Sequence, residues 1–524
     1  MAHASGAQPS ARTLAGLLNE RAEGAPAAVG AVTADSRATW AELRAGAARA
    51  AAALRRDGVG RGDRVAVLLD NRLEWLQVAF GAASLGAVVT PINTWVKTRD
   101  LDYLLGHAQP RVLVTIDQLG KQDYLGYLGE LGVPGPLVER LVVVGKEVPA
   151  GAVSFDHWAT GDADFVDVAD PGEIALVLYT SGSTANPKAV PLTHRHLIEN
   201  GWAIGSRQGL SPADRVFLSA PLAWAYGSAN ALMSSFTHGA ALVLQSTFDA
   251  AGAYELLRRE RCTSIYTLPV MTRALLDLPG FDAASLPDLR RGLTIGPPAE
   301  LVLAHGALGV DQICNIYGST ETYGNCCVTP HDAPFARRVS SQGPPLDGVE
   351  LRIVDVDTRA PLGVGQVGEI LVRGRITPGY LGADRHPERV TDDSGFFATG
   401  DLGSLDADGW LTFAARDSEM IKTAGINVSP AEVEAFLASH PDVVEVAVVG
   451  AEAEVRGQVV VAFVRLVPGA EVTTDQLRAW CKDSIASYKA PAAVIAIEAM
   501  PTTPTGKLSR RDLVRLAGEH LRAV

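Results

Sequence analysis

The sequence predicts an α/β fold with a large N-terminal domain of mainly parallel sheets flanked by helices and a small α+β C-terminal domain. Short apolar runs alternate with helical patterns over most of the chain, and this alternation is typical of parallel sheets. A strand-like run near residue 415 gives way to a polar stretch. A chain of 524 residues also exceeds what one hydrophobic core supports. We therefore expect domains over residues 1–415 and 416–524.

The alternation of elements can be followed along the large domain. Helices are predicted over residues 42–56 and 74–85, and strands over residues 65–69, 88–91, 112–116 and 174–179. The first of these helices is rich in alanine and should end at Asp57-Gly58.

The small domain has its own helix signal and strands. Pro430 suits the first helical position, Ser429 can cap it, and Glu432 can complete a capping box. His440-Pro441 should end this helix. Strands are predicted over residues 410–414, before the boundary, and over residues 443–449, 459–464 and 494–497 after it.

A glycine-rich run, Gly363-Val-Gly365-Gln-Val-Gly368, matches the letters of a dinucleotide-binding fingerprint. That fingerprint needs a following helix, whose N-terminus receives the pyrophosphate. Residues 369–373 form a strand pattern instead. The sequence therefore argues against a dinucleotide site here.

Composition excludes several functional classes. The formal net charge of −13 disfavours a nucleic-acid partner or a polybasic membrane anchor. Residues 1–12 lack the apolar core of a signal peptide, and no uncharged apolar stretch is long enough to span a bilayer. The five cysteines show no metal-ligand spacing. We expect a cytoplasmic protein that binds neither nucleic acid nor membrane.

The segment from Tyr179 to His194 has the clearest chemical signal. An apolar strand runs into a loop of small hydroxyl residues, which is followed by Pro187 and Lys188. Such a loop can offer backbone N–H groups, hydroxyls and one ammonium to a polyphosphate. Pro187 stands where a Walker loop needs glycine. Taken alone, the segment could equally be a polar surface turn.

Further motifs follow in order: Tyr317-Gly-Ser-Thr-Glu321, Thr399-Gly-Asp401, Arg416 with Ile421-Lys422 and Gly425, and Pro504-Thr-Gly-Lys507. In order and spacing the chain resembles the acyl-adenylate-forming superfamily, in its acyl-CoA synthetase branch. The resemblance covers nearly the whole sequence. It implies the two-domain architecture, a mobile C-terminal lid, and ATP or acyl-AMP, Mg²⁺ and coenzyme A as ligands.

The resemblance also implies roles for individual residues. Lys507 would bridge the substrate carboxylate and the phosphate, Thr320 would hold the α-phosphate, and Glu321 would bind Mg²⁺. The β- and γ-phosphates would lie on Lys188 and the loop Thr180, Ser181, Gly182, Ser183 and Thr184. Asp401 and Arg416 would bind the ribose. The remaining nucleotide contacts would come from Gly296, Pro297, Pro298, Asn315, Ile316, Tyr317, Gly318 and Ser319.

The same resemblance places an acyl pocket at Trp224, Ala225, Tyr226 and Gly227, a coenzyme A contact at Gly425 and a hinge at Ser418. The segment from Pro221 to Gly227 has no acidic residue, which disfavours an α-amino acid. Each assignment has a plainer explanation: Trp224 and Tyr226 could be core aromatics, Asp401 and Glu321 turn residues, and Lys507 a solvated lysine.

The phosphate loop departs from the superfamily pattern, because Ala185 and Ala189 stand where glycine is usual. We therefore predict a CoA ligase for a bulky, non-amino carboxylic acid, and its adenylation step is either impaired by these alanines or fully competent. Three further functions stay open: a ligase that only converts a pre-formed adenylate to its thioester, an adenylation enzyme that loads a carrier protein, and a non-catalytic binder of AMP-like ligands. A homodimer stays open as well.

Overall fold

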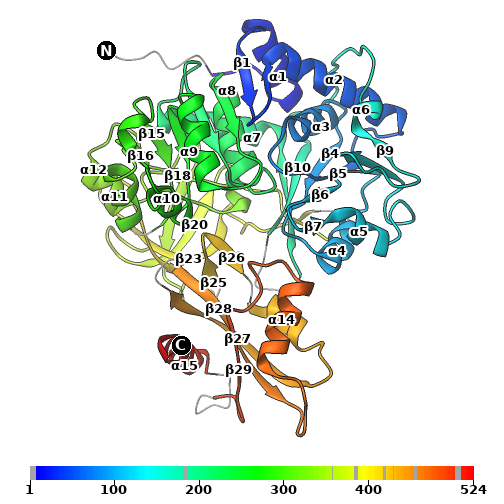
Figure 1. Ribbon diagram of the computed structural model, residues 1–524. Coiled ribbons are helices and arrows are strands. Elements are labelled where there is room, and N and C mark those ends of the chain that lie inside the picture. The colour runs from blue at the N-terminus through cyan, green and yellow to red at the C-terminus, as the bar shows by residue number, and fades with distance from the viewer. Residues whose placement is uncertain are drawn as a thin grey trace. The chain divides into compact units, whose positions relative to one another are not determined.

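The computed structural model describes residues 8–180, 186–296, 298–356, 358–382, 387–416, 421–428, 430–453, 457–501 and 509–523. The chain divides into two compact units. The first comprises Met1–Thr94, Asp102–Leu178 and Ala189–Ala415, and the second comprises Trp95–Leu101, Tyr179–Lys188 and Arg416–Val524. Figure 1 labels many of the elements named below.

One sheet of the first unit has the strand order β22-β21-β11-β10-β4-β3-β5-β8-β9. Its central pairs, β10 with β4, β4 with β3, β3 with β5 and β5 with β8, are parallel. The strands are β3 (Arg64–Leu68), β4 (Val88–Pro91), β5 (Val112–Ile116), β8 (Arg140–Val144), β9 (Val153–Ser154), β10 (Ile174–Thr180), β11 (Lys188–Thr193), β21 (Tyr380–Leu381) and β22 (Pro387–Glu388). The central strands are nearly continuous apolar runs because helices cover a parallel sheet on both faces.

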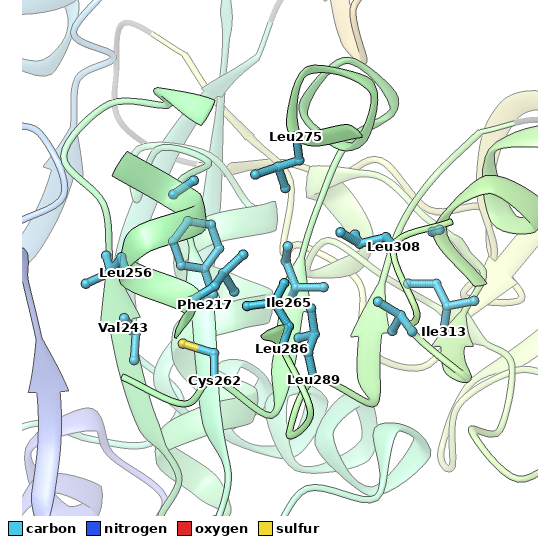
Figure 2. Close-up of a cluster of buried hydrophobic side chains, with 14 of the residues drawn as sticks. Phe217, Val243, Leu256, Cys262, Ile265, Leu275, Leu286, Leu289, Leu308 and Ile313 are labelled. Atoms are coloured by element: carbon cyan, nitrogen blue, oxygen red, sulfur yellow. The ribbon is translucent and has the colours of Figure 1, made fainter. Parts of the chain in front are cut away.

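A second sheet has the order β16-β15-β14-β12-β13-β1-β2. Its strands are β1 (Val29–Val32), β2 (Arg37–Thr39), β12 (Arg215–Leu218), β13 (Ala241–Leu244), β14 (Ser264–Tyr266), β15 (Arg291–Leu293) and β16 (Gln312–Cys314). Phe217, Val243 and Ile265 on these strands pack with Leu256 and Leu275 from the covering helices (Figure 2). This cluster fixes one face of the sheet and so positions the loops at its carboxyl edge.

A third, antiparallel sheet has the order β19-β20-β23-β24, with strands β19 (Glu350–Val354), β20 (Gly368–Arg373), β23 (Phe397–Leu405) and β24 (Leu411–Arg416). Strand β20 begins at Gly368, so the glycine-rich run leads into a strand, as predicted. Small ladders pair β6 (Gln118–Leu119) with β7 (Gln122–Asp123) and β17 (Ile316–Tyr317) with β18 (Cys327–Val328).

The helices of the first unit are α1 (Leu14–Gly24), α2 (Trp40–Arg56), α3 (Leu73–Ser84), α4 (Thr98–Ala108), which the unit boundary crosses, α5 (Tyr124–Glu130), α6 (Phe155–Trp158), α7 (His194–Gln208), α8 (Met233–Thr237), α9 (Ala250–Arg259), α10 (Pro269–Leu276), α11 (Pro298–Gly306) and α12 (Phe335–Ser340). Among them, α2 and α3 lie where helices are predicted over residues 42–56 and 74–85 (Figure 1). Helix α2 starts two residues before its predicted start, because Thr39 and Glu42 form a capping box. A Cβ at Gly81 would lie 2.8 Å from the Ala47 carbonyl oxygen, so glycine allows α3 to approach α2 closely.

The second unit contains the predicted small α+β domain. Its sheet has the order β26-β25-β28-β27, and β29 pairs with β28 in parallel. The elements are β25 (Ile421–Thr423), β26 (Ile426–Val428), α13 (Pro430–Leu437), β27 (Val443–Ala453), β28 (Gly457–Leu466), α14 (Thr474–Ser484), β29 (Ala493–Ala496) and α15 (Arg510–Ala523). Ser429 lies outside the described residues, and Glu432 Oε1 accepts a hydrogen bond from Lys489 Nζ at 2.6 Å. Among the described residues no helix combines the length and the hydropathy needed to cross a bilayer.

Candidate active site

The turn that carries Glu321 follows β17 directly. Thr320–Thr322 form one turn of 3-10 helix, and Tyr323 then takes a left-handed conformation with φ +58°. Thr320 and Glu321 are half-buried. The Tyr380 hydroxyl, from β21, donates a hydrogen bond to Glu321 Oε1 at 2.8 Å. The carboxylate therefore has a partner that the sequence motif does not contain.

Asp401 and Tyr317 meet in the first unit, although they are 84 residues apart in sequence. Asp401 lies on β23 and is 6% exposed, and its Oδ2 accepts a hydrogen bond from the Tyr317 hydroxyl at 2.9 Å. Burial, and then the Asp401 charge, raise the pKa of Tyr317 well above its usual value. The phenol therefore stays protonated and supports a carboxylate whose two oxygens suit a vicinal diol.

The phosphate loop is described only at its two ends. Thr180 ends β10 and Lys188 begins β11, and both are half-buried. Ser181, Gly182, Ser183, Thr184 and Ala185 lie outside the described residues. Ala189 is 2% exposed, pairs with Leu381 across β11 and β21, and has no positive φ. Its methyl group therefore sits in an ordinary strand, so the concern about the loop backbone applies to Ala185 and not to Ala189.

The segments expected around the adenine are residues 296–298 and 315–317. Gly296 has φ +143°, in a conformation that favours glycine. Asn315 is buried, and its Nδ2 donates a hydrogen bond to the Ser341 carbonyl at 2.9 Å. Ile316 is buried as well, and Pro297 lies outside the described residues. The Asn315 side chain thus holds the fold around the segment.

The acyl segment leads into a π-helix, η1 (Tyr226–Leu232), and π-helical segments are often found at functional sites. Trp224, Ala225 and Tyr226 are half-exposed, whereas Gly227 is buried. A Cβ at Gly227 would lie 2.3 Å from the Pro221 carbonyl oxygen, so only glycine allows this turn.

Tyr226 is anchored at the carboxyl edge of the second sheet. Its hydroxyl lies 2.9 Å from the Thr267 carbonyl oxygen and 2.8 Å from that of Leu293. Burial and the neighbouring Tyr266 raise its pKa well above the usual value. The half-buried phenol therefore stays neutral at the sheet edge where ligands of α/β folds bind.

Asn71 holds the acyl segment through hydrogen bonds to its backbone. The sequence motifs do not indicate this residue. Its Nδ2 donates to the carbonyl oxygens of Ala220 and Gln245, at 3.0 and 3.1 Å. The Leu222 N–H donates to Asn71 Oδ1 at 2.8 Å. Asn71 is 2% exposed and follows β3. Its position after a buried strand was the only signal for it in the sequence.

The second unit holds the remaining assigned residues. Gly425 is exposed with φ +82°, and Ala424 before it has φ +50°, so these two residues form the turn between β25 and β26. Arg416 is the last residue of β24. Ser418 and Lys507 lie outside the described residues.

The described residues contain no group of three or more His, Cys, Asp or Glu side chains that could hold a metal ion. Mg²⁺ is commonly bound by one or two carboxylates together with substrate phosphates, without a cage made of protein alone. The half-buried Glu321 fits a Mg²⁺ ion that arrives with ATP, and such an ion would offset phosphate charge.

Comparison with known proteins shows the family to which the chain belongs. The profile of the AMP-binding enzyme family matches residues 18–381, and that of the AMP-binding enzyme C-terminal domain matches residues 432–507. YngI of Bacillus subtilis, which carries the name acyl-CoA synthetase, is 30% identical and the match covers 96% of each chain. 4-Coumarate–CoA ligase 3 of Oryza sativa subsp. japonica is 32% identical, with 91% of this chain and 87% of that protein covered.

A solved structure, o-succinylbenzoate CoA synthetase of Bacillus subtilis bound to a product analogue, matches with a TM-score of 0.80 and 27% identity. The match covers 95% of this chain and 98% of the other. The chain therefore belongs to the AMP-binding enzyme family, in the acyl-CoA synthetase branch of the acyl-adenylate-forming superfamily, and is an AMP-forming acid–thiol ligase.

Proposed function

We propose that this ligase forms coenzyme A thioesters of bulky carboxylic acids that carry no other charge. The observation behind this is the chemistry of the three segments around Tyr226, which are residues 221–227, 267–270 and 294–296. None of them contains Asp, Glu, Lys, Arg or His. Half-exposed members of these segments include Trp224, Pro269 and Ile295.

A charged acyl group would need a partner in these segments. An α-ammonium needs a carboxylate, and a distal carboxylate or sulfonate needs a cation. Without such a partner, burial of the charge costs on the order of several kcal/mol. Aromatic side chains instead suit flat apolar groups. The likeness to a 4-coumarate ligase supports an aryl acid as one such group.

Matched pairs of acids test this proposal. We expect 3-phenylpropanoate to be activated and phenylalanine, which adds an α-ammonium, to be rejected. Hexanoate should likewise form its CoA thioester faster than adipate, which adds a distal carboxylate. Formation of the CoA thioester is measured with each acid, ATP and Mg²⁺. A preference for the charged member of either pair would refute the proposed substrate class.

We also propose that Ala185 weakens the adenylation step. If the loop needs a left-handed residue there, alanine costs about 1–2 kcal/mol relative to glycine. The effect should be selective, because only the first step carries the β- and γ-phosphates. Conversion of a synthetic adenylate to its thioester should stay intact, and a ligase limited to that second step is the extreme case.

Pyrophosphate exchange with an accepted acid measures the first step. We expect Ala185→Gly to raise exchange roughly tenfold, the rate equivalent of about 1.4 kcal/mol, without changing the rate from adenylate to CoA thioester. Ala189→Gly is the matched control, since Ala189 lies in strand β11, and it should not raise exchange. Robust exchange in the unmodified protein would contradict the impairment.

The identity of the thiol acceptor is tested with a competing carrier domain. If a carrier protein is the true acceptor, thioester formation on an added carrier domain should be faster than thioester formation on CoA. A purely non-catalytic role as a binder of AMP-like ligands is excluded, because the chain is a ligase of this family. The cytoplasmic location stays a prediction.

A further inference from the structure

A short segment, Thr377–Leu381, connects the Glu321 turn to strand β11. The Thr377 N–H donates a hydrogen bond to the Glu321 carbonyl oxygen at 2.8 Å, and the Thr377 hydroxyl donates to the Pro191 carbonyl oxygen at 2.7 Å. Leu381 then pairs with Ala189. The turn that carries the acid is thus tied to the strand that follows the phosphate loop.

Tyr380 lies within this segment and is the member that reaches the acid. Its hydroxyl is 2.8 Å from Glu321 Oε1. The phenol hydroxyl is the donor and the carboxylate oxygen the acceptor, which assigns Oε1 to a fixed hydrogen bond.

A second attachment holds the same turn without using the carboxylate. The Tyr323 hydroxyl accepts a hydrogen bond from the Thr193 N–H at 3.0 Å and lies 3.1 Å from Thr193 Oγ1, also on β11. Tyr323 is 0% exposed. The backbone contact of Thr377 and the attachment of Tyr323 would both survive loss of the Tyr380 hydroxyl. Removing that hydroxyl should therefore free the Glu321 carboxylate without releasing the turn.

We infer that Tyr380 is a positioning residue that holds Oε1 of Glu321 and leaves Oε2 as the ligand for the divalent cation that accompanies ATP. Hydrogen bonds to a ligating carboxylate commonly fix its orientation, and losing such a partner costs roughly 10–100-fold in metal affinity. This inference rests on the proposed role of Glu321.

The test uses Mn²⁺ as a paramagnetic substitute for Mg²⁺. Binding of Mn²⁺ to the full-length protein with a non-hydrolysable ATP analogue is titrated by electron paramagnetic resonance. We expect Tyr380→Phe to weaken Mn²⁺ binding about tenfold. Binding of the analogue in the presence of a chelator and the melting temperature should be unchanged, because the turn keeps its other attachments.

Tyr323→Phe is the matched control, since it also removes a phenol hydroxyl, but one that contacts Thr193 on β11 and not the carboxylate. It should lower the melting temperature and leave Mn²⁺ affinity intact. Glu321→Gln sets the reference for loss of the ligand itself.

Unchanged Mn²⁺ affinity in Tyr380→Phe, with a loss in Glu321→Gln, would refute the positioning role alone. Unchanged affinity in both variants would refute the metal role of Glu321 and the inference with it. Parallel losses of melting temperature, analogue binding and metal binding in Tyr380→Phe would show a merely structural hydroxyl, which also overturns the inference.

Discussion

At the scale of single residues, the two acids of the candidate site share one arrangement. Tyr317 donates to Asp401 at 2.9 Å, and Tyr380 donates to Glu321 at 2.8 Å. In both pairs burial keeps the phenol protonated. A neutral donor can orient a carboxylate without cancelling its charge, so each acid remains available to its ligand.

Loss of the hydrogen bond between Tyr317 and Asp401 should affect both half-reactions. Ribose is present in ATP and in the acyl-adenylate, so Tyr317→Phe should raise the KM for ATP and for a synthetic adenylate to a similar extent. The loss of one hydrogen bond, about 1 kcal/mol, corresponds to roughly a fivefold rise. Steady-state kinetics of each half-reaction measures this. A rise in the KM for ATP alone would contradict a ribose contact at Asp401.

At the scale of elements, the junction of β11 and α7 anchors the start of helix α1. His194 begins α7 and is 0% exposed, and its Nδ1 accepts a hydrogen bond from the Leu14 N–H at 3.2 Å. Because that nitrogen accepts, it cannot carry a proton. Burial lowers the pKa of His194 to about 4. The fold therefore requires neutral imidazole at this junction.

This junction predicts a dependence of stability on pH. An unfolded histidine titrates near 6.5, above the folded value of about 4. The unfolded state therefore binds more protons between these values. The contribution of His194 to the free energy of unfolding is complete above pH 6.5. It is lost as the pH falls toward 4, by up to about 1.4 kcal/mol per pH unit.

Melting temperatures at pH 7.5 and 5.0 test this. His194→Gln keeps an acceptor for Leu14 and should show a smaller fall than the unmodified protein. His238 is also buried, with its pKa lowered to about 4 by burial, so part of the fall should remain. The exposed His157 supplies the control, and His157→Gln should leave the fall unchanged. An equal fall in the His194 variant would refute the assignment.

At the scale of the whole molecule, the residues that the superfamily resemblance assigns are found in both compact units. Glu321 and Asp401 belong to the first unit, and Lys188, Gly425 and Lys507 belong to the second. Strand β24 ends at Arg416, the first residue after Ala415 at the division between the units. The superfamily resemblance implies a mobile C-terminal lid, so we propose a hinge close to this division.

The proposed hinge residue is Ser418. Ser418→Pro should fix the backbone there and slow one half-reaction more than the other. Ser418→Ala, which leaves the backbone free, should have little effect on either. Single-turnover rates of adenylation and of thioester formation decide the matter. Equal slowing of both steps by proline would remove the hinge assignment.

Much of the fold could be predicted from local pattern. Strands β4 and β5 begin and end where the apolar runs do, and β10 extends one residue past its predicted end. In the small domain, β27 continues to Ala453, past the predicted end at residue 449. Its continuation pairs with β28, a partner that apolar periodicity along one strand does not reveal.

The sequence by itself determined the fold class, the family and the order of motifs, because hydrophobic periodicity and ordered short motifs are local properties of a chain. Only the tertiary structure decided which side chains support the motif acids. Tyr380 and Glu321 are 59 residues apart, and Asn71 and Leu222 are 151 apart. Asn71 and Leu222 follow strands β3 and β12, whereas Tyr380 lies on β21, and the order of the strands in the sheets decides which of these distant segments meet.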